Sequence, residues 1–200
     1  AVDNGAHIIN MSFGKGFSPN KAVVDEAVRY AESKGVLLVH AAGNDGADLE
    51  SEPSFPNRYF ADGDSASLWI EVGASSWQGA DQLAAPFSNY GRGRVHVFAP
   101  GVDIRSTIPG NGYEENSGTS MAAPVVSGLA ALIMAYYPEL DAADVKRIIL
   151  ETATPYAGRR VVRPGSEGER VDFAQLSATG GIVNAYAALR MAEQLAQRKR

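Results

Sequence analysis

The sequence of 200 residues contains no cysteine, has no excess of positive charge and has no long apolar run. Without cysteine, the chain can form no disulfide, thiol nucleophile or metal site with thiolate ligands. The formal net charge of -5 argues weakly against nucleic acid and anionic membranes as partners. Since no stretch of about 18 consecutive apolar residues occurs, we predict no membrane span.

What is present is the composition of one ordinary globular domain. Hydrophobic residues make up 45% of the chain and charged residues 20%, which provides apolar material for a sizeable core. The length also lies within the usual range of a single domain. The 21 glycines and 10 prolines predict many tight turns.

The first third of the chain predicts a strand, a helix and a second strand. Residues 7–11 are β-prone, and Ser18-Pro19 fits a helix start, because serine is a good N-cap and proline suits the first helical position. Apolar residues then recur at helical spacing until Gly35, which ends the helix. Residues 36–39 form a continuous apolar run, typical of a parallel strand buried on both faces. Such a unit lies within one parallel sheet.

The rest of the chain continues this alternation. Strands and helices are expected to alternate along it. This alternation predicts an α/β fold with a doubly wound, mainly parallel sheet flanked by helices. In chain order, the expected elements are a surface loop over 45–65, strands at 68–72 and 95–98, a helix from Ser120 to about Tyr136, a helix capped by Asp141 and reaching Leu150, an exposed loop over 159–170 and a final amphipathic helix over 184–197.

Two glycine-containing segments follow neighbouring strands, where open parallel sheets bind ligands. Glycine allows a ligand backbone to approach closely, and both segments can offer backbone groups to an extended peptide. The second segment also carries an asparagine amide as a donor. The segments are Ser12-Phe13-Gly14 and Ala41-Ala42-Gly43-Asn44.

A serine stands at the start of an expected helix, in Gly118-Thr119-Ser120. The positive end of the helix dipole and the free N–H groups there favour negative charge, which suits an oxyanion beside a serine nucleophile. One N–H from the Ser120 backbone and one from the Asn44 amide would form a two-donor oxyanion hole. The alternative is that Ser120 only caps its helix.

Several segments, in the same chain order, resemble the subtilisin family of serine peptidases. Gly118 to Ala122, with Pro124 and Gly128 after it, resembles the family's nucleophile motif, and 41–44 resembles its oxyanion-hole segment. Residues 10–14 resemble the strand that lines its substrate cleft. Chance does not explain so many matches in order. The further matching segments are Phe87–Gly91, Ala99–Gly101, Ser106–Gly110 and Gly180–Ala185.

The resemblance implies a subtilisin-like fold truncated at its N-terminal side, with residues 1–200 as the C-terminal portion of one peptidase domain. It implies a serine endopeptidase that works through an acyl-enzyme. Its catalytic residues would be Ser120 as nucleophile and Asn44 as oxyanion stabiliser. The substrate-binding residues would be Ser12, Phe13, Gly14, Ala41, Ala42, Gly43 and Thr119.

The family order is Asp, His, Ser, so we expect the catalytic Asp and His upstream of residue 1 and expect this chain alone to be inactive. None of the three histidines matches the family's histidine motif. His7 and His96 have no motif context, and His40, although it precedes 41–44, is better interpreted as a packed core residue than as a base. The alternative function is a non-catalytic binding or scaffold module with the same fold.

Four acids follow the oxyanion segment, and Ser54 aligns with the floor of the pocket for the residue before the cleaved bond. The acids Asp45, Asp48, Glu50 and Glu52 either favour basic residues in the substrate or form a solvated acidic loop. We prefer the solvated loop.

The resemblance also implies protein or peptide substrates, no nucleic acid, and a secreted or cell-envelope location, although no signal peptide is visible in the chain. No cofactor is required and no metal ligands are assigned; calcium binding through scattered loop oxygens is left open. A sheet truncated at its N-terminal side would expose a strand edge and an apolar face. We therefore expect a homo-oligomer, unless an upstream half stays bound.

Overall fold

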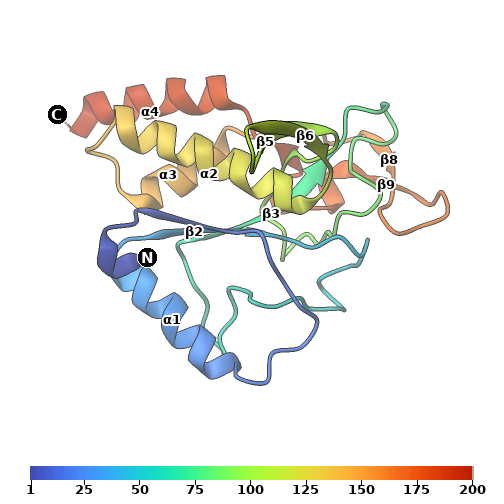
Figure 1. The fold of residues 1–200 in the computed structure, drawn as a ribbon. Helices are drawn as coiled ribbons and strands as arrows, with labels where there is room; N and C mark the ends of the chain where they lie inside the picture. The colour runs from blue at the N-terminus through green and yellow to red at the C-terminus, as the bar shows by residue number, and fades with distance from the viewer. Residues whose placement is uncertain (200) are drawn as a thin grey trace.

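The computed structural model describes residues 1–199 and contains a six-stranded sheet flanked by helices (Figure 1). The strands follow the spatial order β1-β2-β3-β4-β10-β7. Neighbouring strands are parallel, except that β7 pairs antiparallel with β10. The predicted mainly parallel α/β architecture is confirmed. The strands are β1 (Ile8–Met11), β2 (Leu37–Ala41), β3 (Trp69–Ser75), β4 (Val97–Pro100), β7 (Thr154–Pro155) and β10 (Gly181–Ile182).

Helix α1 lies on one face of this sheet, and α2, α3 and α4 lie on the other (Figure 1). The sequence predicts all four helices. The predicted loop over 45–65 is also confirmed, since these residues, all of which the structure describes, form no helix or strand. The helices are α1 (Lys21–Ser33), α2 (Thr119–Tyr136), α3 (Ala142–Glu151) and α4 (Ala185–Lys199), with short 3-10 turns η1 (Val2–Asn4) and η2 (Phe173–Gln175).

Helix α1 begins later than the sequence predicts. The expected start was Ser18-Pro19, but Asn20 is the N-cap, and its carbonyl accepts the first helical hydrogen bond from the N–H of Val23 at 3.1 Å. The end of the helix is as predicted. Gly35 has a left-handed φ of 72°, a conformation that glycine adopts without steric cost.

Helix α2 packs across the sheet and forms the centre of the core. By length and composition alone it could cross a membrane, with a mean hydropathy of 1.5. It instead contacts β1 to β4, and its small side chains allow close packing. Gly101 sits where a Cβ would lie 2.6 Å from the Cβ of Ala74 and 2.9 Å from the carbonyl of Gly118. The absence of that Cβ brings the N-terminus of α2 onto the end of β4.

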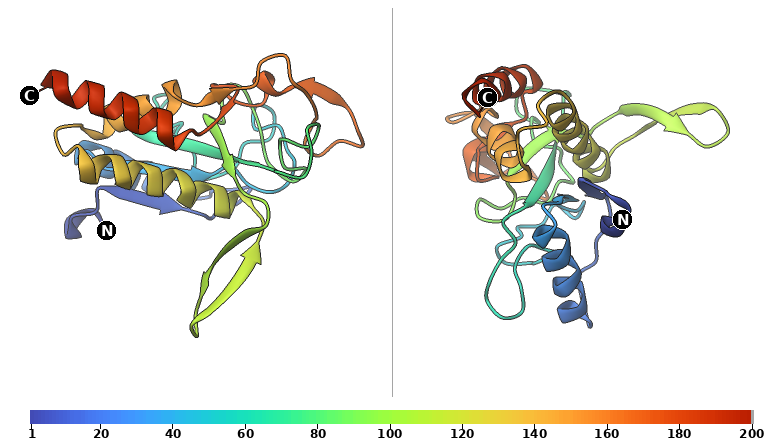
Figure 2. Two further views of the ribbon diagram at one scale, coloured as in Figure 1. Left: turned by 90° about the horizontal axis from the view of Figure 1, so that it is seen from above. Right: turned by 90° about the vertical axis from the view of Figure 1, so that its left-hand side faces the viewer.

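Two hairpins complete the fold, and the sequence predicts neither. The hairpin of β5 (Ile104–Ile108) and β6 (Gly112–Asn116) projects from the body of the molecule (Figure 2). The hairpin of β8 (Arg160–Val162) and β9 (Arg170–Asp172) includes the segment expected as an exposed loop at 159–170, and residues 163–169 connect its two strands. Most residues of this segment are exposed as expected, but the expectation was wrong at Val161, which is fully buried in one apolar cluster with Phe173.

Strand β1 lies at one edge of the sheet and pairs with β2 alone among the described strands. Beside it, an apolar groove runs between Ile8 on β1 and Met134 on α2. The open edge expected from the sequence is thus present. The expected homo-oligomer stays a prediction.

Candidate functional site

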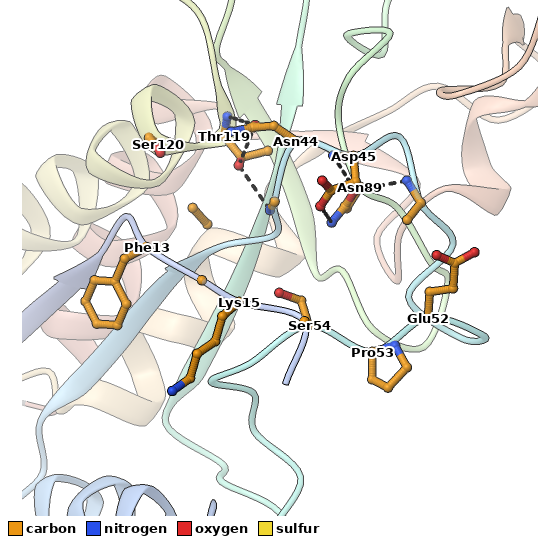
Figure 3. Close-up of a pocket in the computed structure, with 15 residues that line it drawn as sticks. Phe13, Lys15, Asn44, Asp45, Glu52, Pro53, Ser54, Asn89, Thr119 and Ser120 are labelled. Carbon is orange, nitrogen blue, oxygen red and sulfur yellow. Dashed lines mark hydrogen bonds between the residues drawn. The ribbon is translucent and has the colours of Figure 1, made fainter. Parts of the chain in front are cut away.

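A cavity of about 630 Å³ lies where β1, β2 and the N-terminus of α2 meet. In Figure 3, Ser120, Thr119 and Asn44 lie along one side, and Lys15, Ser54, Pro53 and Glu52 lie along the other. This is the carboxyl end of the parallel strands, where the sequence predicts a ligand. The lining residues are Phe13, Gly14, Lys15, Gly16, Ala41, Gly43, Asn44, Asp45, Ala47, Glu52, Pro53, Ser54, Asn89, Thr119 and Ser120.

The side chain of Asn44 is held by the first residue of α2. Its Oδ1 accepts hydrogen bonds from the backbone N–H of Thr119 at 2.8 Å and from the Thr119 hydroxyl at 2.9 Å. Because a backbone N–H can only donate, these contacts assign the oxygen of the Asn44 amide without ambiguity. Within residues 1–199 the amide nitrogen has no partner, so its two N–H groups are available to a ligand.

Thr119 is fully buried and does more than hold Asn44. Its hydroxyl oxygen also accepts a hydrogen bond from the N–H of Gly43 at 3.1 Å. One hydroxyl therefore joins the start of α2 to two consecutive residues after β2. This arrangement fixes the distance between the Asn44 amide and the helix N-terminus.

Ser120 is the second residue of α2. Its backbone N–H lies in the first turn, where helical N–H groups have no intrahelical acceptor, and no acceptor is found among residues 1–199. The Ser120 hydroxyl likewise has no hydrogen-bond partner in that range. An 18-residue helix adds the positive end of its dipole at this point. The site thus offers two free donors beside an unengaged hydroxyl.

Asn89 is a supporting residue that the sequence analysis did not single out. It is 1% exposed, and its Oδ1 accepts hydrogen bonds from the N–H of Asp45 at 3.0 Å and of Ala47 at 2.9 Å. Its Nδ2 donates to the carbonyl of Ala42 at 2.9 Å. Asn89 therefore fixes the loop that carries Asn44. The sequence did hold one signal for Asn89, because it lies in segment 87–91, one of the segments noted above as matching in order.

A glycine makes room for that amide. A Cβ on Gly43 would lie 2.4 Å from Asn89 Nδ2, and Gly43 has a left-handed φ of 106°. Both the space and the backbone conformation therefore require glycine.

The opposite wall is formed by the chain after β1, which is tied down at three points. The Ser12 hydroxyl donates to the carbonyl of Ser120 at 2.9 Å. The Phe13 carbonyl contacts His40 Nε2 at 2.8 Å. Lys15 exchanges two backbone hydrogen bonds with Phe55, at 2.8 and 2.9 Å. This wall is therefore held to the helix, to the sheet and to the 45–65 loop.

Seven of the nine predicted site residues line the cavity and two do not. Ala42 is fully buried, its N–H donates to the carbonyl of Val72 and its own carbonyl is taken by Asn89, so no group of Ala42 reaches a ligand. The Ser12 hydroxyl points to Ser120 rather than into the cavity. The residues brought together are Phe13, Gly14, Ala41, Gly43, Asn44, Thr119 and Ser120.

The four acids of the following loop separate into two pairs. Asp45 and Glu52 line the cavity. Asp48 accepts from the N–H of Glu50, and Glu50 accepts from the N–H of Gly93 at 2.6 Å and lies 3.5 Å from Arg94. Asp45, Glu50 and Glu52 are exposed, as the solvated-loop interpretation expects, and Asp48 is half-buried. Ser54, expected near the pocket floor, does line the cavity.

None of the three histidines is placed to act on Ser120. His40 is fully buried, and both its ring nitrogens are occupied by Glu71 and the Phe13 carbonyl. His96 Nδ1 accepts from the backbone N–H of Glu71, and burial lowers the pKa of His96 to about 3, helped by the nearby positive charges of Lys146 and Arg58. His7 lies at the opposite end of β1.

Metal-ligating side chains do not cluster in this part of the chain. Over residues 1–199 there is no group of three or more His, Cys, Asp or Glu side chains that could hold a metal ion.

Comparison with known proteins gives one family. The model of the Subtilase family (Peptidase_S8) matches residues 1–178. The chain is 40% identical over 154 residues to alkaline elastase YaB from Bacillus sp. (strain YaB), covering 77% of this chain and 36% of that protein. It is 39% identical over 155 residues to subtilisin BL from Lederbergia lenta, covering 77% of this chain and 51% of that protein. The chain thus spans between 36% and 51% of these relatives.

Solved structures give the same result for the fold. The self-cleaved protease domain of PatA superposes with a TM-score of 0.70 at 31% identity, covering 96% of this chain and 64% of that chain. The prenylagaramide maturation protease PagA superposes with a TM-score of 0.71 at 29% identity, covering 94% of this chain and 63% of that chain.

Proposed function

Because this chain belongs to the Subtilase family, we propose that it supplies the nucleophile and the oxyanion hole of a serine endopeptidase. The observation that carries the proposal is the pairing of Thr119 with Asn44, which leaves the Asn44 amide N–H groups and the Ser120 N–H as free donors beside the Ser120 hydroxyl. A scaffold module would need neither the serine nor the oriented amide. The non-catalytic alternative is therefore disfavoured.

In the proposed reaction, the oxygen of the Ser120 hydroxyl attacks the carbonyl carbon of the scissile peptide bond, and its proton passes to a histidine base. The carbonyl oxygen becomes negative as its double bond opens, and the N–H groups of Ser120 and Asn44 stabilise that charge. The protonated base then gives its proton to the leaving amine as the C–N bond breaks. Water hydrolyses the resulting ester of Ser120 by the same steps in reverse.

We place the histidine base and its aspartate partner outside these 200 residues. His40 and His96 are committed to Glu71 or to the Phe13 carbonyl, and His7 lies away from the cavity. Serine is a weak nucleophile without an adjacent base. The 200-residue chain by itself is therefore expected to be inactive, as the C-terminal portion of a complete peptidase domain.

The proposed substrates are proteins or peptides that bind in extended form against Phe13 and Gly14. Two acids, Asp45 and Glu52, and one base, Lys15, line the cavity, and this charge balance does not suit nucleic acid. A secreted or cell-envelope location is also part of the proposal, by likeness to the family.

The test is labelling with a fluorophosphonate probe, which reacts with activated serines. We expect the full-length protein to label at Ser120 and its Ser120→Ala variant not to label. The matched control is Ser127→Ala, on the same helix, whose hydroxyl contacts Asn10 at 2.9 Å and should leave labelling unchanged. Full-length protein that fails to label would favour the scaffold alternative. Labelling of the 200-residue chain alone would show that the base lies within it.

A further inference from the structure

A buried polar network lies beneath the wall of the cavity. His40 on β2 and Glu71 on β3 are register partners on adjacent strands, and His40 Nδ1 lies 2.7 Å from Glu71 Oε1. The indole N–H of Trp69 donates to the other carboxylate oxygen of Glu71 at 2.7 Å. On its outer side, His40 Nε2 lies 2.8 Å from the carbonyl oxygen of Phe13. The network therefore runs from the middle of the sheet to the chain that forms the cavity wall.

The atoms in this network determine where its protons lie. A carbonyl oxygen can only accept, so His40 Nε2 must carry a proton and donate it to Phe13. The contact between Nδ1 and the Glu71 carboxylate needs a second proton between the two atoms. Because an imidazole is more basic than a carboxylate, this proton belongs to Nδ1, so His40 acts as a double donor and Glu71 balances its charge.

The surroundings favour this arrangement. Burial disfavours the charged imidazole, but the charge and hydrogen bond of Glu71 and the carbonyl of Phe13 outweigh burial and raise the pKa of His40. Three other titratable or charged residues lie close to Glu71. His96 accepts a hydrogen bond from the Glu71 backbone N–H, and Arg58 and Arg94 line a cavity of about 20 Å³ together with Glu71.

Stability alone does not explain a charged pair at this position. Removing two charges from water is costly, and apolar residues of similar volume are often as stable as a buried ion pair. Leu38, on the same face of β2, and Trp69, whose ring lies 5.3 Å from that of His40, are buried, so an apolar residue would suit position 40. What an apolar residue would lack is a donor to the Phe13 carbonyl.

We propose that His40 is a positioning residue of the substrate cavity, which fixes the Phe13 carbonyl and thereby the wall against which substrate lies. The proposal rests on the proposed peptidase function, because the wall has no other assigned role. The same wall reaches the nucleophile helix through the Ser12 hydroxyl and the Ser120 carbonyl. His40 would therefore act on substrate binding through Phe13 and Gly14, and not on the bond-breaking step.

The test compares three variants of the full-length protein. Glu71→Gln removes the charge but keeps the contacts, since a glutamine N–H can donate to Nδ1 and its oxygen can accept from Trp69. The double variant His40→Leu, Glu71→Gln leaves no buried charge and no donor to Phe13. The control is His96→Asn, which alters a neighbouring buried histidine that has no contact with Phe13.

Amide hydrogen exchange of residues 12–16 is measured first, because it does not depend on activity. We expect exchange to be about tenfold faster in the double variant than in Glu71→Gln, the effect of losing one buried hydrogen bond, and unchanged in His96→Asn. Equal exchange in Glu71→Gln and the double variant would overturn the proposal.

Peptide hydrolysis is measured second. We expect KM to be several-fold higher in the double variant than in Glu71→Gln, with a smaller change in kcat. If exchange rises while KM stays equal in an active protein, His40 supports the fold alone and the positioning role is wrong. If the unmodified protein cleaves no peptide, the peptidase proposal fails separately, and the exchange comparison still decides whether His40 holds the wall.

Discussion

The side chain of Asn44 presents its oxygen twice to Thr119, once to the backbone N–H at 2.8 Å and once to the hydroxyl at 2.9 Å. The direction of the Asn44 amide, the proposed oxyanion donor, is therefore set by Thr119, a residue with no role in the proposed bond-breaking steps. Thr119→Val removes the hydroxyl and keeps the shape. We expect kcat for a peptide substrate to fall about tenfold with little change in KM, since one hydrogen bond to the amide is lost. Thr119→Ser should retain most of the activity; equal loss in both variants would contradict this role.

Loss of the Asn44 amide should have a larger effect. Asn44→Ala removes one of the two proposed oxyanion donors, and we expect kcat to fall on the order of 10²–10³, a magnitude measured for the oxyanion asparagine of a subtilisin. KM should change little, because the donor acts on charge that develops in the transition state. A variant with kcat near that of the unmodified protein would remove Asn44 from the oxyanion hole.

Asn89 should be required for stability of the loop that carries Asn44. Asn89→Ala would remove the side-chain partner of one buried carbonyl, at Ala42, and of two partly buried N–H groups, at Asp45 and Ala47. We expect the free energy of unfolding to fall by about 3 kcal/mol in urea denaturation. The control is Asn20→Ala, at a helix N-cap whose side chain makes no capping hydrogen bond, which should change stability little. Similar values for the two variants would mean that the Asn89 contacts are replaced by water.

The buried His96 predicts loss of stability in acid. Its pKa is lowered from 6.5 to about 3, so between these values the unfolded chain binds a proton that the folded chain does not. Stability therefore falls as pH drops below 6.5, by up to about 1.4 kcal/mol per pH unit. His96→Asn, which keeps an acceptor for the Glu71 N–H, should remove this contribution. The measurement is the difference between urea titrations of the two proteins from pH 7 to pH 4.

His40 predicts the opposite dependence. The Glu71 carboxylate and the Phe13 carbonyl raise its pKa against the effect of burial, so the folded chain keeps a proton that the unfolded chain releases. Its contribution to stability is complete below the unfolded pKa near 6.5 and is lost as pH rises through the raised value. We expect the unmodified protein to lose more stability between pH 7 and pH 10 than the variant His40→Leu, Glu71→Gln. Parallel pH curves would contradict this assignment.

Much of the fold follows from local patterns. The buried run at 36–39, the helix cap at Asp141 and the helix end at Gly35 all lie where the sequence predicts them, because each depends on neighbours within a few residues. The β5–β6 hairpin was missed because most of its residues are exposed and give no core pattern. The β8–β9 hairpin was missed because its strands are short and Val161 is their one fully buried apolar residue, which is too little to give a strand pattern.

The sequence by itself determined the family and the mainly parallel α/β fold, because short motifs in a constant order carry that information, and the same motifs led to Ser120 and Asn44 as the proposed catalytic residues. Only the tertiary structure decided how those residues are supported. Thr119 meets Asn44 across 75 positions, and His40 meets Glu71 across 31. Contacts between residues so far apart depend on which strands become neighbours, and no local propensity records that choice.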